Sequence, residues 1–476
     1  MQRKTILVTS LVLLLGCGGS SQPVKPGSAD KAQEVKQPAS GDGTSKAALD
    51  LSLQVQTWTL DNGLTVIFDR DSRLPVVAVE VRYLVGSSHE RPGRSGFAHL
   101  FEHLMFQGSQ NFDDEYFKPY EPIGGRVNGT TNVDRTNYYQ RVPKEYLERV
   151  LWMESDRMQN LLPVLSQAKL DNQRSVVKNE RRQSYEDRPY GMVWLRMFEA
   201  LYPKGHPYDH TPIGSHEDLS AATLDDVKAF FKEYYVPRNA VLTLSGDFEI
   251  DEAKTLIKRY FGSIESGQRA ARPLVKTSPK LDKTIHIVEP DEVKMPRIHM
   301  VWHTPRLYEK GDAELDVLSS ILTQGKNARL YRPLVMEQKV AKDVSAFQVS
   351  MALGSFFVVQ ATVAPGRSLS ELETSLTESL AAAFATPPTD DEMSRALNGW
   401  KKSFYGRLES VISRASLLSN YYHLADDANY LTKDLGRYAT LSASDIHGVA
   451  KKYLTGNHLR IDVVPVAPKA SKENAK

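Results

Sequence analysis

The two halves of the chain repeat one strand-to-helix pattern, and this repetition limits the folds open to it. The first copy runs from an apolar strand into an apolar helix that stops at Gln107-Gly108, and the second copy stops in the same way at Gln324-Gly325. A helix end, a tyrosine, an asparagine and a strand also recur, at 230–247 and at 449–465. Since a unit of roughly 200 residues is a typical domain, we expect an α+β protein with two homologous domains, each a mostly antiparallel sheet packed with helices.

Shifts in composition divide the chain into six segments. Large apolar side chains are scarce from residue 18 to about residue 50, and the stretch 266–283 is polar and carries prolines, as linkers do. The predicted boundaries are 1–16 for a signal peptide, 17–50 for a flexible tether, 51–265 for a first domain, 266–283 for a linker, 284–468 for a second domain and 469–476 for a tail.

The N-terminus has the pattern of an export signal. Basic Arg3 and Lys4 precede a largely apolar run from Ile6 to Leu15, which is too short for a permanent membrane span. The letters LLGC around Cys17 resemble a bacterial lipobox. This resemblance implies cleavage before Cys17, a lipid on its sulfur, and an exported lipoprotein that lies at the outer membrane or faces the periplasm.

Charge and cysteine content exclude two other classes of protein. The formal net charge is +2, which gives no electrostatic support for nucleic-acid binding. Cys17 is the only cysteine, so no disulfide can form within the chain. The fold must therefore be held by its cores.

One short motif carries the chemistry. His99, Glu102 and His103 form the pattern HxxEH within GFAHLFEHLMFQGS. On a helix the two histidines are four residues apart, so both imidazoles lie on one face and can bind a single ion. The residues around them, such as Phe101 and Leu104, are apolar, and polar groups in such a setting need partners. A zinc site fits, in which the glutamate accepts a proton from a metal-bound water.

A third ligand is needed, and the stretch 170–191 supplies candidates. Leu170, Val176 and Val177 predict a helix there that packs inward. Periodicity alone does not choose among Glu180, Glu186 and Asp187 as the carboxylate ligand.

Beyond these motifs, much of the chain resembles one family. The stretches that carry the resemblance are 96–109, 128–143, 151–158, 176–183, 206–208 and 234–248. Together they resemble the pitrilysin/insulinase family of zinc metallopeptidases, in the short two-domain branch that includes the catalytic subunit of the mitochondrial processing peptidase. The resemblance runs from about residue 52 to residue 467. It implies the fold shared by LuxS-type metalloenzymes and the mitochondrial processing peptidase.

The resemblance also implies the roles of single residues. His99, His103 and Glu180 would bind one Zn²⁺ per chain, and Glu102 would be the general base. Glu180 lies 77 residues after His103, which is the family's spacing. Gln173 stands where the family often has a second glutamate, and it can hydrogen-bond a neighbour of the metal but carries no charge, so the zinc affinity could differ.

The stretch 127–142 predicts how a peptide would be held. It is rich in Thr, Asn, Val and Tyr, which suits an edge strand that pairs with an extended peptide. The family binds substrates in this way. Asn128, Thr130 and Thr131 are therefore the candidate substrate-binding residues, although an ordinary sheet strand would have the same composition.

The second half predicts a partner. By resemblance, family members that work alone, and subunits that assist a catalytic chain, carry an Arg and a Tyr seven residues apart, where this chain has Val335 and Lys342. We therefore expect a homologous partner subunit that supplies this pair and lacks HxxEH. The predicted function is a zinc endopeptidase that cleaves extended peptides or unfolded small proteins. The alternative is a non-catalytic binding or assembly protein that retained the fold.

Overall fold

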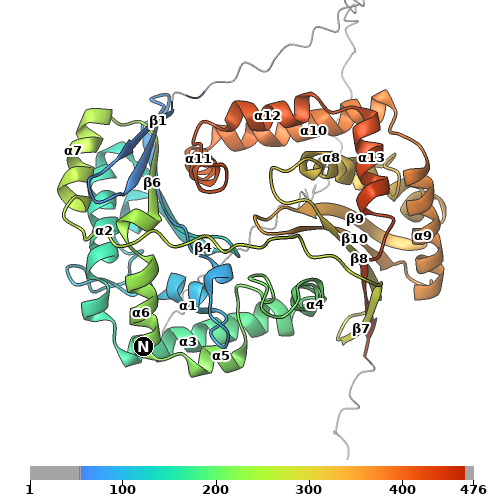
Figure 1. The fold of residues 1–476 in the computed structure, drawn as a ribbon, viewed down its shortest axis with the longest axis horizontal. Helices are drawn as coiled ribbons and strands as arrows, with labels where there is room; N and C mark the ends of the chain where they lie inside the picture. Colours follow the sequence, from blue (N-terminus) through green and yellow to red (C-terminus); the bar gives the residue numbers. More distant parts are fainter. Residues whose placement is uncertain (1–52, 54, 467–476) are drawn as a thin grey trace, which may run out of the picture.

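The computed structural model describes residue 53 and residues 55–466, in which the two halves of the chain form two α+β units (Figure 1). The predicted signal peptide, tether and tail lie outside the described residues. We call residues 55–261 the first half and residues 285–465 the second half. No helix in the described part of the chain combines the length and the apolar character that a membrane crossing requires.

The first half is built on one six-stranded sheet with the order β1-β2-β6-β3-β5-β4. Its strands are β1 (Val55–Thr59), β2 (Thr65–Arg70), β3 (Val76–Tyr83), β4 (Arg126–Thr131), β5 (Thr136–Pro143) and β6 (Ala240–Gly246). Its helices are α1 (Phe97–Leu104), α2 (Leu147–Asn160), α3 (Gln167–Arg181), α4 (Met192–Leu201), α5 (His216–Ala221), α6 (Leu224–Tyr234) and α7 (Ile250–Phe261). The turn at Asn62-Gly63 joins β1 to β2 as an antiparallel hairpin.

The second half has a five-stranded sheet with the order β7-β11-β8-β10-β9. Its strands are β7 (Ile285–Asp291), β8 (Arg297–Thr304), β9 (Ala341–Val349), β10 (Ser355–Val363) and β11 (Leu459–Pro465). Its helices are α8 (Asp312–Thr323), α9 (Leu369–Ala385), α10 (Asp390–Glu409), α11 (Val411–Ala425), α12 (Leu431–Ala439) and α13 (Ala443–Tyr453).

The two sheets share one topology. In the first half β2 pairs in parallel with β6, and β6, β3, β5 and β4 then follow in antiparallel order. In the second half β7 pairs in parallel with β11, and β11, β8, β10 and β9 follow in the same way. The prediction of an α+β fold with two mostly antiparallel sheets is confirmed.

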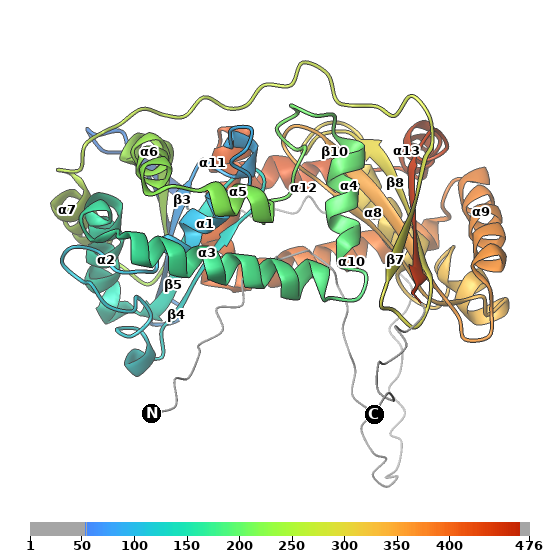
Figure 2. The same cartoon turned by 90° about the horizontal axis from the view of Figure 1, so that it is seen from below.

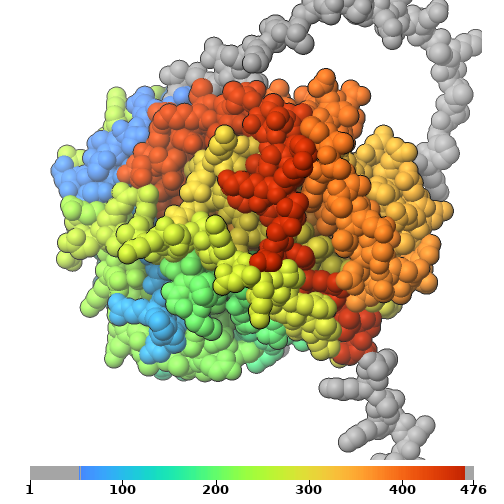
Figure 3. All heavy atoms as spheres, turned by 45° about the vertical axis from the view of Figure 1, so that its right-hand side comes forward, coloured from blue at the N-terminus to red at the C-terminus, as the bar shows by residue number. Residues whose placement is uncertain are grey.

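One helix of each half packs on the sheet of the other half. Helix α11 packs on β2, β3 and β6 of the first half, and α4 packs on β7 and β11 of the second half (Figure 1). Leu418 of α11 is buried with Ile67 and Val241, and Phe198 of α4 is buried with Phe356. In Figure 3 the orange-red residues of the second half accordingly lie against the blue residues of the β1–β2 region. The halves therefore cannot separate without exposing apolar surface on both sheets.

The alternation along β3 explains why this exchange is needed. Val77, Val79 and Val81 face the main core of the first half, whereas Glu80 and Arg82, which are also buried, point to the face that α11 covers. Both sheet faces are thus shielded from water. Only the first face is covered by helices of the same half.

Buried charges pair where α11 meets the first sheet. Arg414 of α11 lies 2.7 Å from Asp69 and 2.8 Å from Asp71. Arg82 lies 3.2 Å from Glu80 and donates to the Asn420 side chain of α11 at 3.0 Å. Removing one member of a buried ion pair typically costs about 3–5 kcal/mol, because its partner is left charged and unpaired. These pairs hold α11 in one position on the sheet.

The chain crosses between the halves in a single extended segment. Residues 262–284 contain neither helix nor strand, and Figure 2 shows them running along the outside of the molecule from α7 to β7. The contact between the halves is therefore made mainly by the exchanged helices and not by this segment.

Candidate metal centre

The motif helix α1 lies inside the core of the first half. All eight of its residues are buried, including His99, Glu102 and His103. The chain enters α1 through Gly96, whose φ of 89° is left-handed and whose Cβ, if it had one, would lie 2.9 Å from the carbonyl oxygen of Ile213. Only glycine fits there. The buried helix is thus brought close to the 211–215 loop.

A buried carboxylate caps the start of α1. The Glu90 carboxylate accepts hydrogen bonds from the backbone N–H of Gly96 at 2.9 Å and of Ala98 at 2.7 Å. An anion at a helix N-terminus also interacts favourably with the helix dipole. His210 lies 2.8 Å from Glu90 and 2.8 Å from Asp209, so the imidazole bridges two carboxylates. This arrangement fixes the helix that carries the motif.

Three side chains from two helices converge. Glu180 comes from the end of α3, which packs on α1. Its Oε2 atom lies 3.3 Å from His103 Nε2 and 3.8 Å from His99 Nε2. In the described part of the chain, these three form the one group of His, Cys, Asp or Glu side chains with ligand atoms close enough to share an ion, all within 4.8 Å of one another.

These residues fit a zinc ion. Bonds of about 2.0–2.2 Å in a tetrahedral site place neighbouring ligand atoms about 3.3–3.6 Å apart, close to the two measured separations. His103 Nε2 is buried and makes no hydrogen bond, which is costly for a polar atom that lacks a ligand. Two imidazoles and one carboxylate are a catalytic zinc set, because three protein ligands leave a fourth position for water or substrate.

The surroundings shift the pKa values of the two histidines in opposite directions. Burial, with the neighbouring His103, lowers the pKa of His99 to about 4, so its ring is neutral at pH 7, as a metal ligand must be. Burial also acts to lower the pKa of His103, but the contact with Glu180 outweighs it and raises that pKa. The buried Gln173 side chain hydrogen-bonds to His103 and contributes to this rise. Gln173 therefore lies where it can orient a ligand ring.

Glu102 is beside the ligands but not among them. It is buried and accepts a hydrogen bond of 2.6 Å from the Thr131 hydroxyl at the end of β4. Burial raises the pKa of Glu102 to about 7, although His103 and Thr131 oppose the shift. A carboxylate with a pKa near the working pH is suited to taking up and releasing a proton.

The three predicted substrate residues lie on β4, at the edge of the sheet. β4 pairs with β5 on one side, and no described strand pairs with its other side. Thr131 holds Glu102, whereas the Thr130 hydroxyl donates to Asn137 at 2.6 Å and points to the opposite sheet face. The Asn128 amide donates to Tyr139 at 3.3 Å. The structure thus brings Thr131 to the metal centre and the other two side chains to the far face.

The sequence did not single out two neighbours of the site. Arg135, in the β4–β5 turn, lies near Glu102, and its positive charge acts to lower the pKa of that carboxyl. Tyr185 lies near Glu180 in the π-helical turn Arg182–Glu186, and burial with the Glu180 charge raises its pKa to about 12. No short-range signal marks either residue, because each reaches the site through a turn or a helix irregularity.

Among the acidic residues left open by the sequence, Glu180 is the one at the histidines. Glu186 instead lies 2.9 Å from Arg181 and 2.8 Å from His216. The inward face predicted for this helix is right for Leu170 and Val177, which are buried, but wrong for Val176, which is exposed. Adjacent helical residues point about 100° apart, and of this pair only Val177 is turned to the core.

The second half keeps the helix without the metal ligands. Helix α8 occupies the place of α1 and begins after the left-handed Gly311, with a φ of 107°. Counted from the Gln-Gly ends, Asp316, Ser319 and Ser320 match His99, Glu102 and His103; counted from Gly96 and Gly311, Glu314, Val317 and Leu318 match them. Neither alignment places a histidine there.

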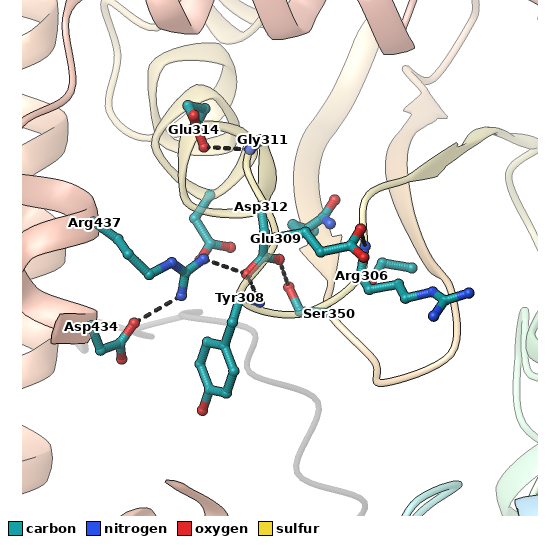
Figure 4. A network of polar contacts seen from close by, with 12 residues as sticks. Arg306, Tyr308, Glu309, Gly311, Asp312, Glu314, Ser350, Asp434 and Arg437 are labelled. Atoms are coloured by element: carbon teal, nitrogen blue, oxygen red, sulfur yellow. Dashed lines mark hydrogen bonds and ion pairs between the residues drawn. The ribbon is translucent and has the colours of Figure 1, made fainter. Parts of the chain in front are cut away.

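Ion pairs occupy the start of α8 instead. Figure 4 shows Asp312 between Arg437, at 2.6 Å, and the backbone N–H of Tyr308, at 3.0 Å. Arg437 also lies 2.8 Å from Asp434. These contacts tie α8 to α12, so this region has a structural role and leaves the chemistry to the first half.

We expect the cap of α1 to make stability depend on pH. Burial disfavours a charged His210, but the hydrogen bonds to Glu90 and Asp209 outweigh this and raise its pKa from 6.5 to about 9. A raised pKa adds stability that is complete below about pH 6.5 and is lost as the pH rises through about 9. Urea unfolding should show a fall of up to about 3 kcal/mol over this range, and His210→Gln should remove most of it. The same fall in His210→Gln would contradict the assignment.

We also expect Glu180 to control metal content. Glu180→Gln removes an anionic ligand and should weaken zinc binding by at least about 100-fold, measured by competition with a chelator. Glu186→Gln, six residues further along, is the matched control and should bind zinc as the parent does. Equal affinities in the two variants would show that Glu180 is not a ligand.

Comparison with known proteins agrees with this geometry. Residues 65–206 match the family model described as insulinase (peptidase family M16), and residues 221–399 match the peptidase M16 inactive domain. The chain is 30% identical over 399 residues to zinc protease PqqE of Helicobacter pylori, covering 83% of this chain and 89% of that protein. A probable mitochondrial-processing peptidase subunit beta of Schizosaccharomyces pombe is 26% identical over 213 residues, covering 44% of this chain and 46% of that protein.

A solved structure extends the comparison to three dimensions. The crystal structure of a protease from Helicobacter pylori superposes with a TM-score of 0.81 at 28% identity, covering 87% of this chain and all of that one, 100%. The two matched family models together span most of the described residues. With its His99, His103 and Glu180 cluster, the chain therefore belongs to the insulinase family of zinc metalloproteases, peptidase family M16.

Proposed function

We propose that this protein is a zinc-dependent endopeptidase that cleaves extended peptides or unfolded small proteins. The observation that carries the proposal is the convergence of His99, His103 and Glu180 beside a buried Glu102, at one end of a strand with an unpaired edge. The ligands and the base are on the same side of β4. A peptide that paired with this edge would bring its backbone carbonyls to the base.

Different residues of the chain would bind the metal, transfer the proton and position these groups during peptide hydrolysis. His99, His103 and Glu180 would hold the zinc, which supplies a Lewis acid to polarise the scissile carbonyl and to acidify water. Glu102 accepts a proton from the attacking water on one carboxylate oxygen and passes it to the amine that leaves. Thr131 keeps Glu102 in position through its hydrogen bond, and Gln173 orients His103. The buried setting limits bulk water around the base.

The edge strand supports an extended substrate. The outer backbone groups of β4 have no partner strand among the described residues, so they can bond to a peptide in β conformation. Such pairing is made by backbone hydrogen bonds, so it does not depend on the side chains of the peptide. An extended peptide or an unfolded chain has free backbone groups along its whole length, which is why we propose peptides and unfolded chains as substrates.

The catalytic role of Glu102 is tested by one conservative change. Glu102→Gln should keep zinc, because Glu102 is not a ligand, but should slow cleavage of an unstructured peptide by about 10²–10⁴-fold, because the base is lost. Glu115→Gln, at an exposed site, is the control and should cleave like the parent. If Glu102→Gln cleaves at the parental rate, the assigned base is wrong. A zinc-loaded parent that cleaves nothing even with the proteins that copurify from its native host would favour the non-catalytic binding protein.

We further propose that the active enzyme includes a homologous partner subunit. Val335 lies in the π-helical turn Arg332–Glu337 and packs on the core of the second half, and Lys342 is exposed on β9. Neither can offer a guanidinium and a phenol to a substrate. A partner with this Arg/Tyr pair and no HxxEH would complete the site.

The partner is tested by purification from the native host. A tagged copy of the chain should recover a homologous chain in about equal amount, and the complex should cleave peptides at least about tenfold faster than the isolated chain, a difference of 1.4 kcal/mol. Light scattering would give the mass of each species. Full activity of the isolated chain as a monomer would contradict this prediction.

We also propose that the protein is an exported lipoprotein, held at the outer membrane or facing the periplasm by a lipid on Cys17. The signal pattern and the position of Cys17 support this. Cys17→Ser should move the protein from the membrane fraction to the soluble fraction and abolish labelling by a radioactive fatty acid. Unchanged labelling would contradict the lipid anchor.

A further inference from the structure

An open pocket in the surface, which we call the cavity, lies at the far end of the edge strand from the metal centre. Its volume is about 600 Å³, and it is lined at the start of β4 by Val127 and Asn128. Its other walls are Phe117 and Tyr120, from the segment before β4, and Tyr139 of β5. Apolar and aromatic groups therefore form most of its surface.

The second half closes one side of this cavity. Ser410 and Ile412, at the start of α11, complete the lining. Figure 1 shows α11 on the inner side of the first sheet, where it is held by the buried pairs of Arg414. The half without metal ligands thus contributes directly to a cavity beside the edge strand.

The cavity and the candidate active site lie at the two ends of one strand. β4 runs from Arg126 to Thr131, and Thr131 bonds to Glu102. From Thr131 back to Val127 is four residues, which is about 13 Å at 3.3 Å per residue. A peptide paired with the edge of β4 would therefore place a residue about four positions from the cleaved bond at the mouth of the cavity.

The polar groups of the cavity already have partners. The Asn128 amide donates to the Tyr139 hydroxyl at 3.3 Å, and the Ser410 hydroxyl accepts from the backbone N–H of Ser413 at 3.4 Å. Arg126 and Glu121 are exposed at the rim, where water solvates them. An apolar side chain entering the cavity would gain by burial against Phe117, Tyr120 and Tyr139, whereas a polar side chain would give up its water.

We propose that this cavity binds a large apolar side chain of the substrate, aromatic by preference, about four residues from the bond that is cleaved, and that Ile412 of the second half sets its shape. The proposal rests on the proposed peptidase function. It adds a side-chain specificity that pairing with β4 cannot supply, because backbone hydrogen bonds do not distinguish one side chain from another. It also gives the second half a role in choosing the substrate.

The experiment uses the full zinc-loaded protein as purified from its native host, with any partner subunit that copurifies, and unstructured peptides whose cleaved bond is identified by mass spectrometry. One pair of peptides differs by Phe or Ala four residues before the bond, and a second pair differs four residues after it. In one of the two pairs, Phe should raise kcat/KM over Ala by about tenfold, mainly through a lower KM, because the contact is remote from the reacting atoms. A Leu peptide should fall between them.

Two tryptophan variants locate the effect. Ile412→Trp fills the cavity and should bring the Phe-to-Ala ratio close to one. Val411→Trp, the neighbouring residue outside the lining, is the matched control and should keep the parental ratio. Peptide affinity measured by fluorescence anisotropy on Glu102→Gln should show the same preference without any cleavage.

The outcomes separate this proposal from the function on which it rests. Equal kcat/KM values for Phe, Leu and Ala in both pairs, with cleavage intact, would overturn the cavity as a binding site and leave the peptidase function standing. A Phe preference that survives in Ile412→Trp would overturn the role of Ile412. If none of the peptides is cleaved or bound, both the function and the cavity proposal fail.

Discussion

The burial of two imidazoles and one carboxylate in the apolar helix α1, with the Glu180 carboxylate of α3 beside them, is the constraint on which the first half depends. Such groups are expensive in a core unless each has a partner. Glu102 has Thr131, His103 has Glu180 and Gln173, and the two histidines with Glu180 fit one metal ion. These groups are positioned by three features, which are the packing of α3, the end of β4 and the capped start of α1. The site is therefore part of the core and not an addition to its surface.

The exchange of α4 and α11 decides how rigidly that site is held. The sheet face that carries Glu80 and Arg82 would be wet and highly charged without α11. With α11 in place, its Arg414 and Ser419 pair with buried carboxylates of the first half. Because breaking such pairs is costly, we infer that the two halves of one chain move as a unit. In the proposed complex, opening toward a substrate would then come from movement of this chain relative to the partner subunit.

The two halves have the same fold but different roles: the first holds the candidate metal ligands, and the second has a structural role. Both halves retain the same strand order and a buried helix that begins after a left-handed glycine. In the first half that helix carries the ligands, and in the second it carries Asp312, which is held by Arg437. Freed from metal binding, the second half supplies α11, which covers the first sheet and lines the cavity near β4. Its contribution to function is thus made by position and shape.

Much of this could be predicted from the sequence, because the signals are local. The apolar strand before the motif and the two histidines four residues apart on an apolar helix are patterns that depend on near neighbours in the chain. The repeat of strand, helix and Gln-Gly end indicated the duplicated fold. The motif also implied that a third ligand must exist. Periodicity, however, did not choose among Glu180, Glu186 and Asp187 as that ligand.

What remained was decided by the tertiary structure, because it depends on which surfaces meet. Only the packing of α3 on α1 brings Glu180, and not Glu186, within 3.3 Å of His103. Apolar periodicity shows that α4 and α11 bury a face, but it does not say that each buries it on the sheet of the other half. The same holds for Thr131, whose side chain turns to Glu102 while that of Thr130 turns away. Local sequence sets the elements and their faces, and long-range packing chooses the partner of each face.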